Sequence, residues 1–64
     1  MKLKTPVEIL KRALEKETEA RDLYEELAVG CATDYVKDLL LTLQNEELKH
    51  MHMIQAMLRR IEAG

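Results

Sequence analysis

The sequence predicts an all-α fold, in which two long helices form an antiparallel hairpin within a single domain of residues 1–64. Apolar residues recur at alternating spacings of four and three along two segments, which is the period of an amphipathic helix. Only two Gly and one Pro interrupt the 64 residues, so little of the chain is suited to turns. Hydrophobic residues make up 47% and charged residues 34%, a balance that favours amphipathic helices over disorder.

The first helix is predicted over residues 6–29. Thr5 can cap its free amides, Pro6 suits the first helical position, and Glu8 can bond back to the capping residue. Gly30 can adopt the left-handed conformation that ends many helices. The inward-facing positions predicted for this helix are Leu3, Val7, Leu10, Leu14, Glu17, Arg21, Tyr24 and Ala28.

The second helix is predicted over residues 34–62, after a short connection at residues 30–33. Thr33 is a suitable N-cap, and Asp34 places an acidic side chain in the first turn. A connection this short makes the two helices antiparallel neighbours. The inward-facing positions predicted here are Val36, Leu40, Leu43, Glu47, His50, Ile54, Met57 and Ile61.

These two stripes pair layer by layer, because residues at equal height in an antiparallel hairpin have numbers that add to a constant. Paired outward from the turn, the inward positions always add to 64. Glu17 and Glu47 therefore share a layer, and His50 lies one layer farther from the turn, opposite Leu14.

Glu17, Glu47 and His50 are ionisable side chains on stripes that are otherwise mostly apolar. A buried carboxylate without a partner costs several kcal/mol, so such groups are protonated, paired or bound to metal. Glu47 and His50 are three residues apart and share one helix face. A Glu on one helix facing Glu-x-x-His on another is half of the ligand set of carboxylate di-iron bundles.

The three residues also lie near the helix midpoints, where a two-fold axis across the bundle would bring second copies of each together. We therefore expect a homodimer that forms a four-helix bundle and holds two metal ions between four carboxylates. Carboxylate and imidazole ligands suit iron, and manganese or zinc are possible substitutes. The alternative is a metal-free helical dimerisation module, whose buried polar layer sets the register.

Composition excludes several other functions. The net charge is −2 with both signs interspersed, which gives no indication of nucleic-acid binding. No apolar run is long enough to cross a membrane. Cys31 is the single cysteine, so no intrachain disulfide is expected and the default location is the cytoplasm.

The run Glu17-x-x-Ala20-x-x-x-Tyr24, followed by Glu47-x-x-His50, resembles the ferritin-like superfamily over nearly all of residues 5–62. Rubrerythrin-type domains carry similar half-motifs twice in one chain. The encapsulated ferritins are the closest resemblance, because their chains hold one half-site and complete the centre at a dimer interface. They also carry a third helix and a shell-targeting tail, which residues 1–64 do not include.

The resemblance implies that Glu17, Glu47 and His50 bind two irons per dimer and that Tyr24 lies near the centre. It implies a ferroxidase that oxidises Fe(II) with O2 for iron storage or detoxification, in rings of dimers within an encapsulin nanocompartment. The first alternative is a rubrerythrin-like peroxide reductase, which would need an electron donor. The second is the metal-free module.

Three nearby side chains have structural interpretations. Tyr24 could bond a ligand carboxylate or simply fill the core with a polar tip. Arg21 is expected to pair with Glu17 or Asp38, or to extend into water. His52 is expected on the surface.

Overall fold

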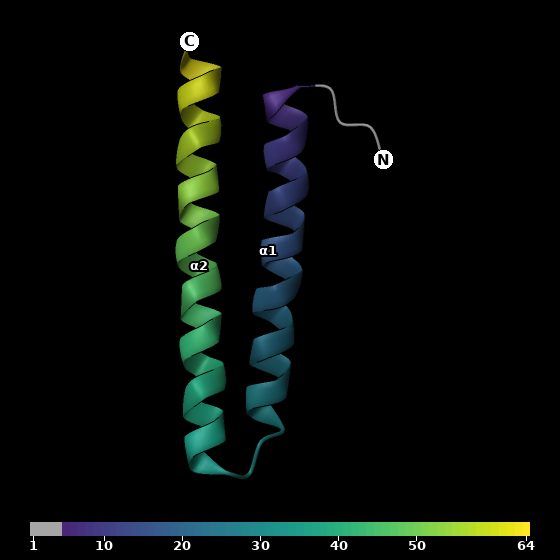
Figure 1. Cartoon of the computed structure of the whole chain (residues 1–64), viewed down its shortest axis with the longest axis vertical. Helices are drawn as coiled ribbons and strands as arrows, with labels where there is room; N and C mark the ends of the chain where they lie inside the picture. Colours follow the sequence, from purple (N-terminus) through teal and green to yellow (C-terminus); the bar gives the residue numbers. More distant parts are fainter. Residues whose placement is uncertain (1–4) are drawn as a thin grey trace.

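The computed structural model describes residues 5–64 as two antiparallel helices that lie side by side (Figure 1). Helix α1 spans Pro6–Val29 and helix α2 spans Asp34–Ala63, one residue beyond the predicted end. The hairpin measures 47 × 24 × 11 Å. The predicted all-helical hairpin is therefore confirmed, and residues 5–64 contain no strand. Leu3, expected to open the first apolar stripe, falls outside the described residues.

The start of α1 has the predicted cap. The Thr5 hydroxyl accepts a hydrogen bond from the Glu8 amide at 3.1 Å, and the Thr5 carbonyl accepts one from the Ile9 amide at 3.0 Å. Pro6 follows directly, where its missing N–H leaves no helical hydrogen bond unmade. The start of α1 is thus determined by hydrogen bonds between residues close together in the sequence.

The connection differs from its sequence prediction in two respects. Gly30 is right-handed, with φ −82° and ψ −5°, rather than left-handed. Its amide donates to the Glu26 carbonyl at 3.3 Å and the Cys31 amide donates to the Ala28 carbonyl at 3.2 Å, so two carbonyls of the last turn of α1 are satisfied without a left-handed residue. Thr33 is extended but forms no side-chain cap; its carbonyl instead accepts the Lys37 amide at 2.9 Å.

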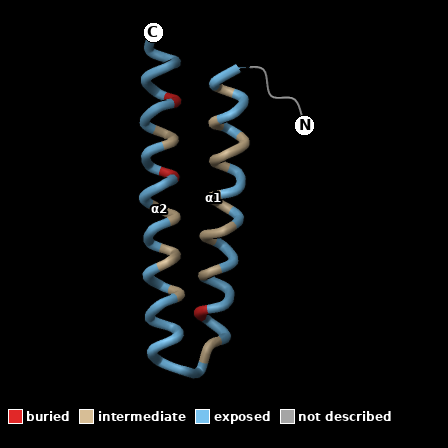
Figure 2. Tube along the Cα trace, in the orientation of Figure 1, coloured by how far each residue is buried: buried red, intermediate tan, exposed pale blue. Residues whose placement is uncertain are grey.

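The buried residues lie on the sides of the two helices that face each other (Figure 2). Three side chains are nearly inaccessible: Ala28 at 1%, Met51 at 8% and Leu58 at 9% relative exposure. Because residues seven apart lie along one line of a helix, α2 presents three adjacent lines of decreasing burial. The first line is Gln44, Met51 and Leu58; the second is Leu40, Glu47 and Ile54; the third is Val36, Leu43, His50 and Met57.

The seam is consequently rotated from the predicted stripe. His50 and Met57 were expected to face inward, but both are exposed in the chain, while Met51 and Leu58 occupy the seam. The apolar surface of α2 is wider than one neighbouring helix can cover, so packing selects which line becomes buried. The heptad line that contains His50 lies at the edge of the contact with α1.

We call the uncovered part of this apolar surface the apolar face. Its exposed members are Ile9, Leu23 and Leu27 of α1, and Val36, Leu39, Met57 and Ile61 of α2. On each helix these positions are rotated from the buried seam residues in the same sense, by roughly 60–140° when counted at about 100° per residue. Antiparallel helices are related by a two-fold axis normal to their common plane, so rotations in the same sense place both sets on the same side of the hairpin.

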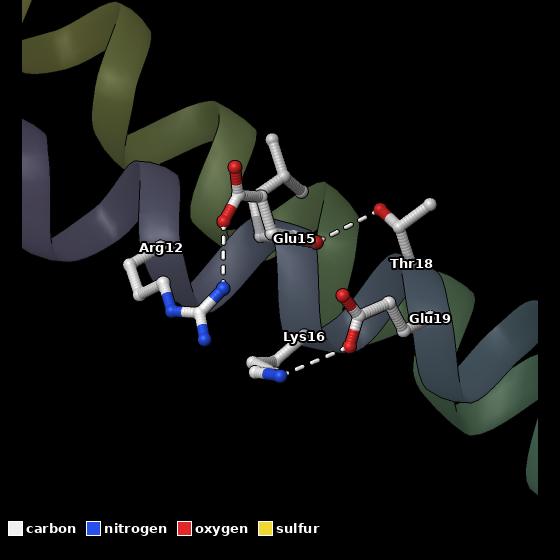
Figure 3. A network of polar contacts seen from close by, with 6 residues as sticks. Arg12, Glu15, Lys16, Thr18 and Glu19 are labelled. Carbon is white, nitrogen blue, oxygen red and sulfur yellow. Dashed lines mark hydrogen bonds and ion pairs between the residues drawn. The ribbon is translucent and has the colours of Figure 1, made fainter.

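The part of α1 that points away from α2 carries ion pairs instead (Figure 3). Arg12 contacts Glu15 at 2.9 Å and Lys16 contacts Glu19 at 3.1 Å, both three residues apart. Exposed pairs of this kind contribute little to stability, about 0.2–1 kcal/mol each. They keep this surface solvated. Within residues 5–64, neither helix combines the length and apolar character needed to cross a membrane.

We predict that Met51→Ala lowers the free energy of unfolding by about 2–3 kcal/mol, because it leaves a cavity in the seam. Met53→Ala is the matched control, since Met53 is 70% exposed on the same helix and its truncation should cost less than about 0.5 kcal/mol. Urea denaturation followed by circular dichroism measures both values. Equal destabilisation by the two substitutions would contradict this rotation of α2.

Candidate metal centre

Glu17 of α1 meets Glu47 and His50 of α2 midway along the hairpin. Each of the three offers one ligand atom, and these atoms all lie within 4.8 Å of one another. The closest contact joins His50 Nδ1 to Glu17 Oε2 at 3.1 Å. The same ring nitrogen lies 3.7 Å from Glu47 Oε2. The structure thus brings together the three residues that the sequence singled out as metal ligands.

The direct contact between His50 and Glu17 follows from the tilt of side chains on a helix. Each side chain leans toward the N-terminus of its own helix. In this antiparallel hairpin Glu17 therefore leans away from the connection, whereas His50 leans toward it. His50 was predicted to lie opposite Leu14, but the two opposed tilts carry its imidazole one layer across to Glu17.

The cluster is open on one side. The exposed side-chain fractions are 18% for Glu47, 29% for Glu17 and 49% for His50. This order follows the heptad lines, because Glu47 lies beside the seam and His50 lies on the line that carries Val36 and Met57 of the apolar face. The sequence predicted a site enclosed between two hairpins, and a single hairpin encloses these groups only partly. The open side is directed toward the apolar face.

The electrostatics of the cluster are those of two acids that share one proton. A hydrogen bond with Glu17 raises the pKa of Glu47, because the protonated Glu47 carboxyl is the donor. The same bond lowers the pKa of Glu17. The hydrogen bond with Glu17 also raises the pKa of His50, since it favours the imidazolium form. Negative charge is therefore concentrated where it attracts protons or a metal cation.

The geometry of the cluster is close to that of a metal site. Ligand bonds to a divalent transition metal are about 2.0–2.2 Å long, so donors of one ion are separated by about 3–4 Å. The contacts of 3.1 and 3.7 Å fall in this range, and the remaining separation is within 4.8 Å. Small side-chain rotations would suffice to bind an ion. Two carboxylates and an imidazole suit iron, manganese or zinc.

Tyr24 is not part of the cluster. It is half-buried on the line of Glu17, two turns toward the connection, which is about 10 Å along the axis. Its hydroxyl forms no hydrogen bond to any residue within the described range 5–64. A catalytic role for Tyr24 stays a prediction from the family resemblance.

Arg21 differs from its prediction. Neither Glu17 nor Asp38 is its partner; its Nε and Nη2 both donate to Asp22 Oδ1, at 3.0 and 2.8 Å. Adjacent residues of a helix do not normally face each other, so the periodicity contained no signal for this pair. The bent side chain keeps the guanidinium hydrated while its stem lies in the seam.

Two further observations concern α2 around His50. Met51 is buried, and its sulfur lies 4.0 Å from the Thr18 hydroxyl, which itself donates to the Leu14 carbonyl at 2.8 Å. This contact was not predicted, and it anchors the residue next to His50 against α1. His52 is exposed on α2, as expected.

We predict that Glu17→Gln lowers the pKa of His50 in metal-free protein, because the amide cannot stabilise the imidazolium charge. The direction of the pH effect on the stability of the fold follows from the raised pKa of His50. The raised pKa stabilises the wild-type fold below the ordinary His pKa, and this contribution disappears as pH rises through the raised value. A titration of the His50 ring by NMR with a chelator present measures the shift. An unchanged His50 pKa would show that the Glu17 contact is absent in solution.

Comparison with known proteins places these observations in a family. A family model described as Rubrerythrin matches residues 8–64, which include both helices and the whole cluster. No curated protein and no solved structure gave a match. The match supports a di-iron function of the ferritin-like kind but does not single out the encapsulated ferritins. The chain therefore belongs to the rubrerythrin family, a family of ferritin-like proteins that typically bind iron.

Proposed function

We propose that this protein is a ferroxidase, which oxidises Fe(II) to Fe(III) with O2 at a di-iron centre shared by two copies of the hairpin. The observation that carries the proposal is the convergence of two carboxylates and one imidazole within 4.8 Å. Membership of the rubrerythrin family supports the choice of iron.

Two features of the chain support a homodimer. A di-iron bundle of this class uses four carboxylates and two histidines, and one hairpin contributes half of that set. The cluster also opens toward the apolar face, which has no partner within residues 5–64. A second hairpin packed antiparallel on this face would cover the apolar side chains and supply the other ligands. Both requirements are met by one symmetric contact.

The residues have distinct roles in this proposal. Glu17 is a terminal carboxylate ligand, Glu47 bridges the two irons, and His50 is a terminal nitrogen ligand. Bound iron displaces the protons that Glu47 and His50 otherwise hold. Two Fe(II) ions release two electrons, and one O2 takes up these electrons and two protons to give hydrogen peroxide. The four carboxylates of the dimer balance the charge of two divalent ions.

The destination of the iron is proposed from the resemblance to encapsulated ferritins. In that case dimers assemble into rings within an encapsulin shell, which stores the Fe(III). Storage or detoxification of iron in the cytoplasm is the corresponding role without a shell.

Peroxide reduction is the second candidate, and the rubrerythrin match is the observation that favours it. Reduction of one hydrogen peroxide to two waters consumes two protons and two electrons. Residues 1–64 contain one cysteine and so lack the paired cysteines of a rubredoxin-type donor. A separate electron-donor protein would have to supply the electrons.

We predict that anaerobic titration with Fe(II), followed by air, loads about one iron per chain and produces ferric absorption. Glu17→Ala and His50→Ala should each abolish this signal, because either change removes a ligand from both iron positions. His52→Ala is the control, since His52 is exposed on the same helix and outside the cluster. Absorption spectroscopy with iron analysis measures the result.

Each other outcome of this titration has a definite meaning. Faster oxidation by hydrogen peroxide than by O2 would favour the peroxide reductase. If Glu17→Ala and His50→Ala retained the iron content and melting temperature of the wild type, the metal-free dimerisation module would replace both enzyme proposals.

We predict that Leu39→Glu converts the dimer into single hairpins, because it places a charge in the apolar face. Leu41→Glu is the matched control: Leu41 is 41% exposed, but it lies two positions along α2 and therefore outside the apolar face. Sedimentation velocity measures the mass of each variant. A dimer that survives Leu39→Glu would contradict assembly through this face.

A further inference from the structure

Arg21 carries a permanent positive charge one helical turn from the cluster, yet it contacts neither carboxylate there. We propose that Asp22 is a positioning residue, which holds the Arg21 guanidinium away from Glu17 and so keeps the carboxylates available to a metal ion. The proposal rests on the proposed metal site, and it concerns what controls the affinity of that site.

The competition that Asp22 prevents follows from helix geometry. Arg21 is four residues after Glu17, and an acid four residues before a base is the favoured arrangement for an ion pair on a helix. The planar guanidinium can donate two parallel hydrogen bonds to one carboxylate. An Arg21–Glu17 pair would occupy the oxygen atoms that a metal needs and would cancel part of the negative charge that attracts it.

The observed contacts direct the guanidinium elsewhere. Nε and Nη2 of Arg21 converge on the single atom Asp22 Oδ1, at 3.0 and 2.8 Å. Two hydrogen bonds to one oxygen define the plane of the guanidinium as well as its position. Asp22 is itself 58% exposed, so the ion pair forms at the surface and not within the cluster. Glu17 remains free to contact His50 at 3.1 Å.

The arrangement also explains how an arginine is accommodated in the seam. Its side chain is 30% exposed, and its position lies on the heptad line of Leu14 and Ala28. The aliphatic stem fills space between the helices, while the charged end needs a partner at the edge. Asp22 supplies that partner on the adjacent residue.

The test is a Co(II) titration of the protein, monitored by d–d absorption, for the wild type and five variants. Asp22→Asn should weaken Co(II) binding by about threefold to tenfold, the range expected when an ion pair of moderate strength competes. Asp22→Glu should retain the wild-type affinity. In an Arg21→Gln background, Asp22→Asn should change the affinity by less than about twofold, because no guanidinium remains to be released.

Glu19→Gln is the matched charge control. Glu19 is 62% exposed, pairs with Lys16 at 3.1 Å (Figure 3) and lies closer in sequence to Glu17 than Asp22 does. If net charge alone controlled the affinity, Glu19→Gln would weaken Co(II) binding at least as much as Asp22→Asn. We expect less than about a twofold change, since Lys16 projects away from the cluster.

A second readout needs no metal. The Nε–H resonance of Arg21 should move in Asp22→Asn as the guanidinium changes partner, and helical content by circular dichroism should stay constant. The proposal is overturned if Asp22→Asn binds Co(II) as tightly as wild type. It is equally overturned if the loss persists in the Arg21→Gln background or is matched by Glu19→Gln. Failure of the wild type to bind Co(II) would overturn the proposed metal centre as well.

Discussion

The contact between Glu17 and the Glu47–His50 pair is the constraint on which the rest of the structure depends. It joins the middle of α1 to the middle of α2, and it places two carboxyl groups close enough to share a proton. Like charges at this separation oppose folding unless a proton or a cation lies between them. A hairpin that holds such a pair at its centre therefore places a candidate cation site between its two helices.

The second constraint is the width of the apolar surface. Each helix carries more apolar surface than its single neighbour covers, and three side chains alone are nearly inaccessible in the hairpin. Two helices alone can bury only a small core between them. The half-open cluster and the uncovered apolar face lie on the same side, so one packing event would complete both the core and the ligand set. The same contact would thus stabilise the helices and supply the remaining candidate ligands.

Charge is distributed over the hairpin in two distinct ways. The exposed side of α1 balances its charges locally, by pairs three residues apart. In the cluster two carboxyl groups face one imidazole, which is their sole basic partner within residues 5–64, and Arg21 is bound to Asp22. Within the described residues, no arginine or lysine therefore occupies these carboxyl groups in place of a proton or a metal cation. The pattern of ion pairs thus agrees with membership of an iron-binding family.

The sequence by itself determined the two helices and the three candidate ligands. Thr5 marks the start of α1 by its capping hydrogen bond, and Pro6 marks it by occupying the first helical position. The 4-3 spacing distinguishes the apolar side of each helix from its solvated side. These signals depend on residues close together in the sequence, so they can be recognised without knowing the fold. The ligands could be found because Glu17, Glu47 and His50 are ionisable residues at positions where the period calls for apolar ones.

Only the tertiary structure decided how the two surfaces meet. The spacing of apolar residues indicates which side of a helix is apolar, but it does not show which line of residues on that side becomes buried. In the structure Met51 and Leu58 lie in the seam, where His50 and Met57 were expected. Side-chain tilt, which spacing does not encode, brought His50 to Glu17 rather than to Leu14. These choices depend on the packing of one helix against the other, and that packing exists only when both helices are in place.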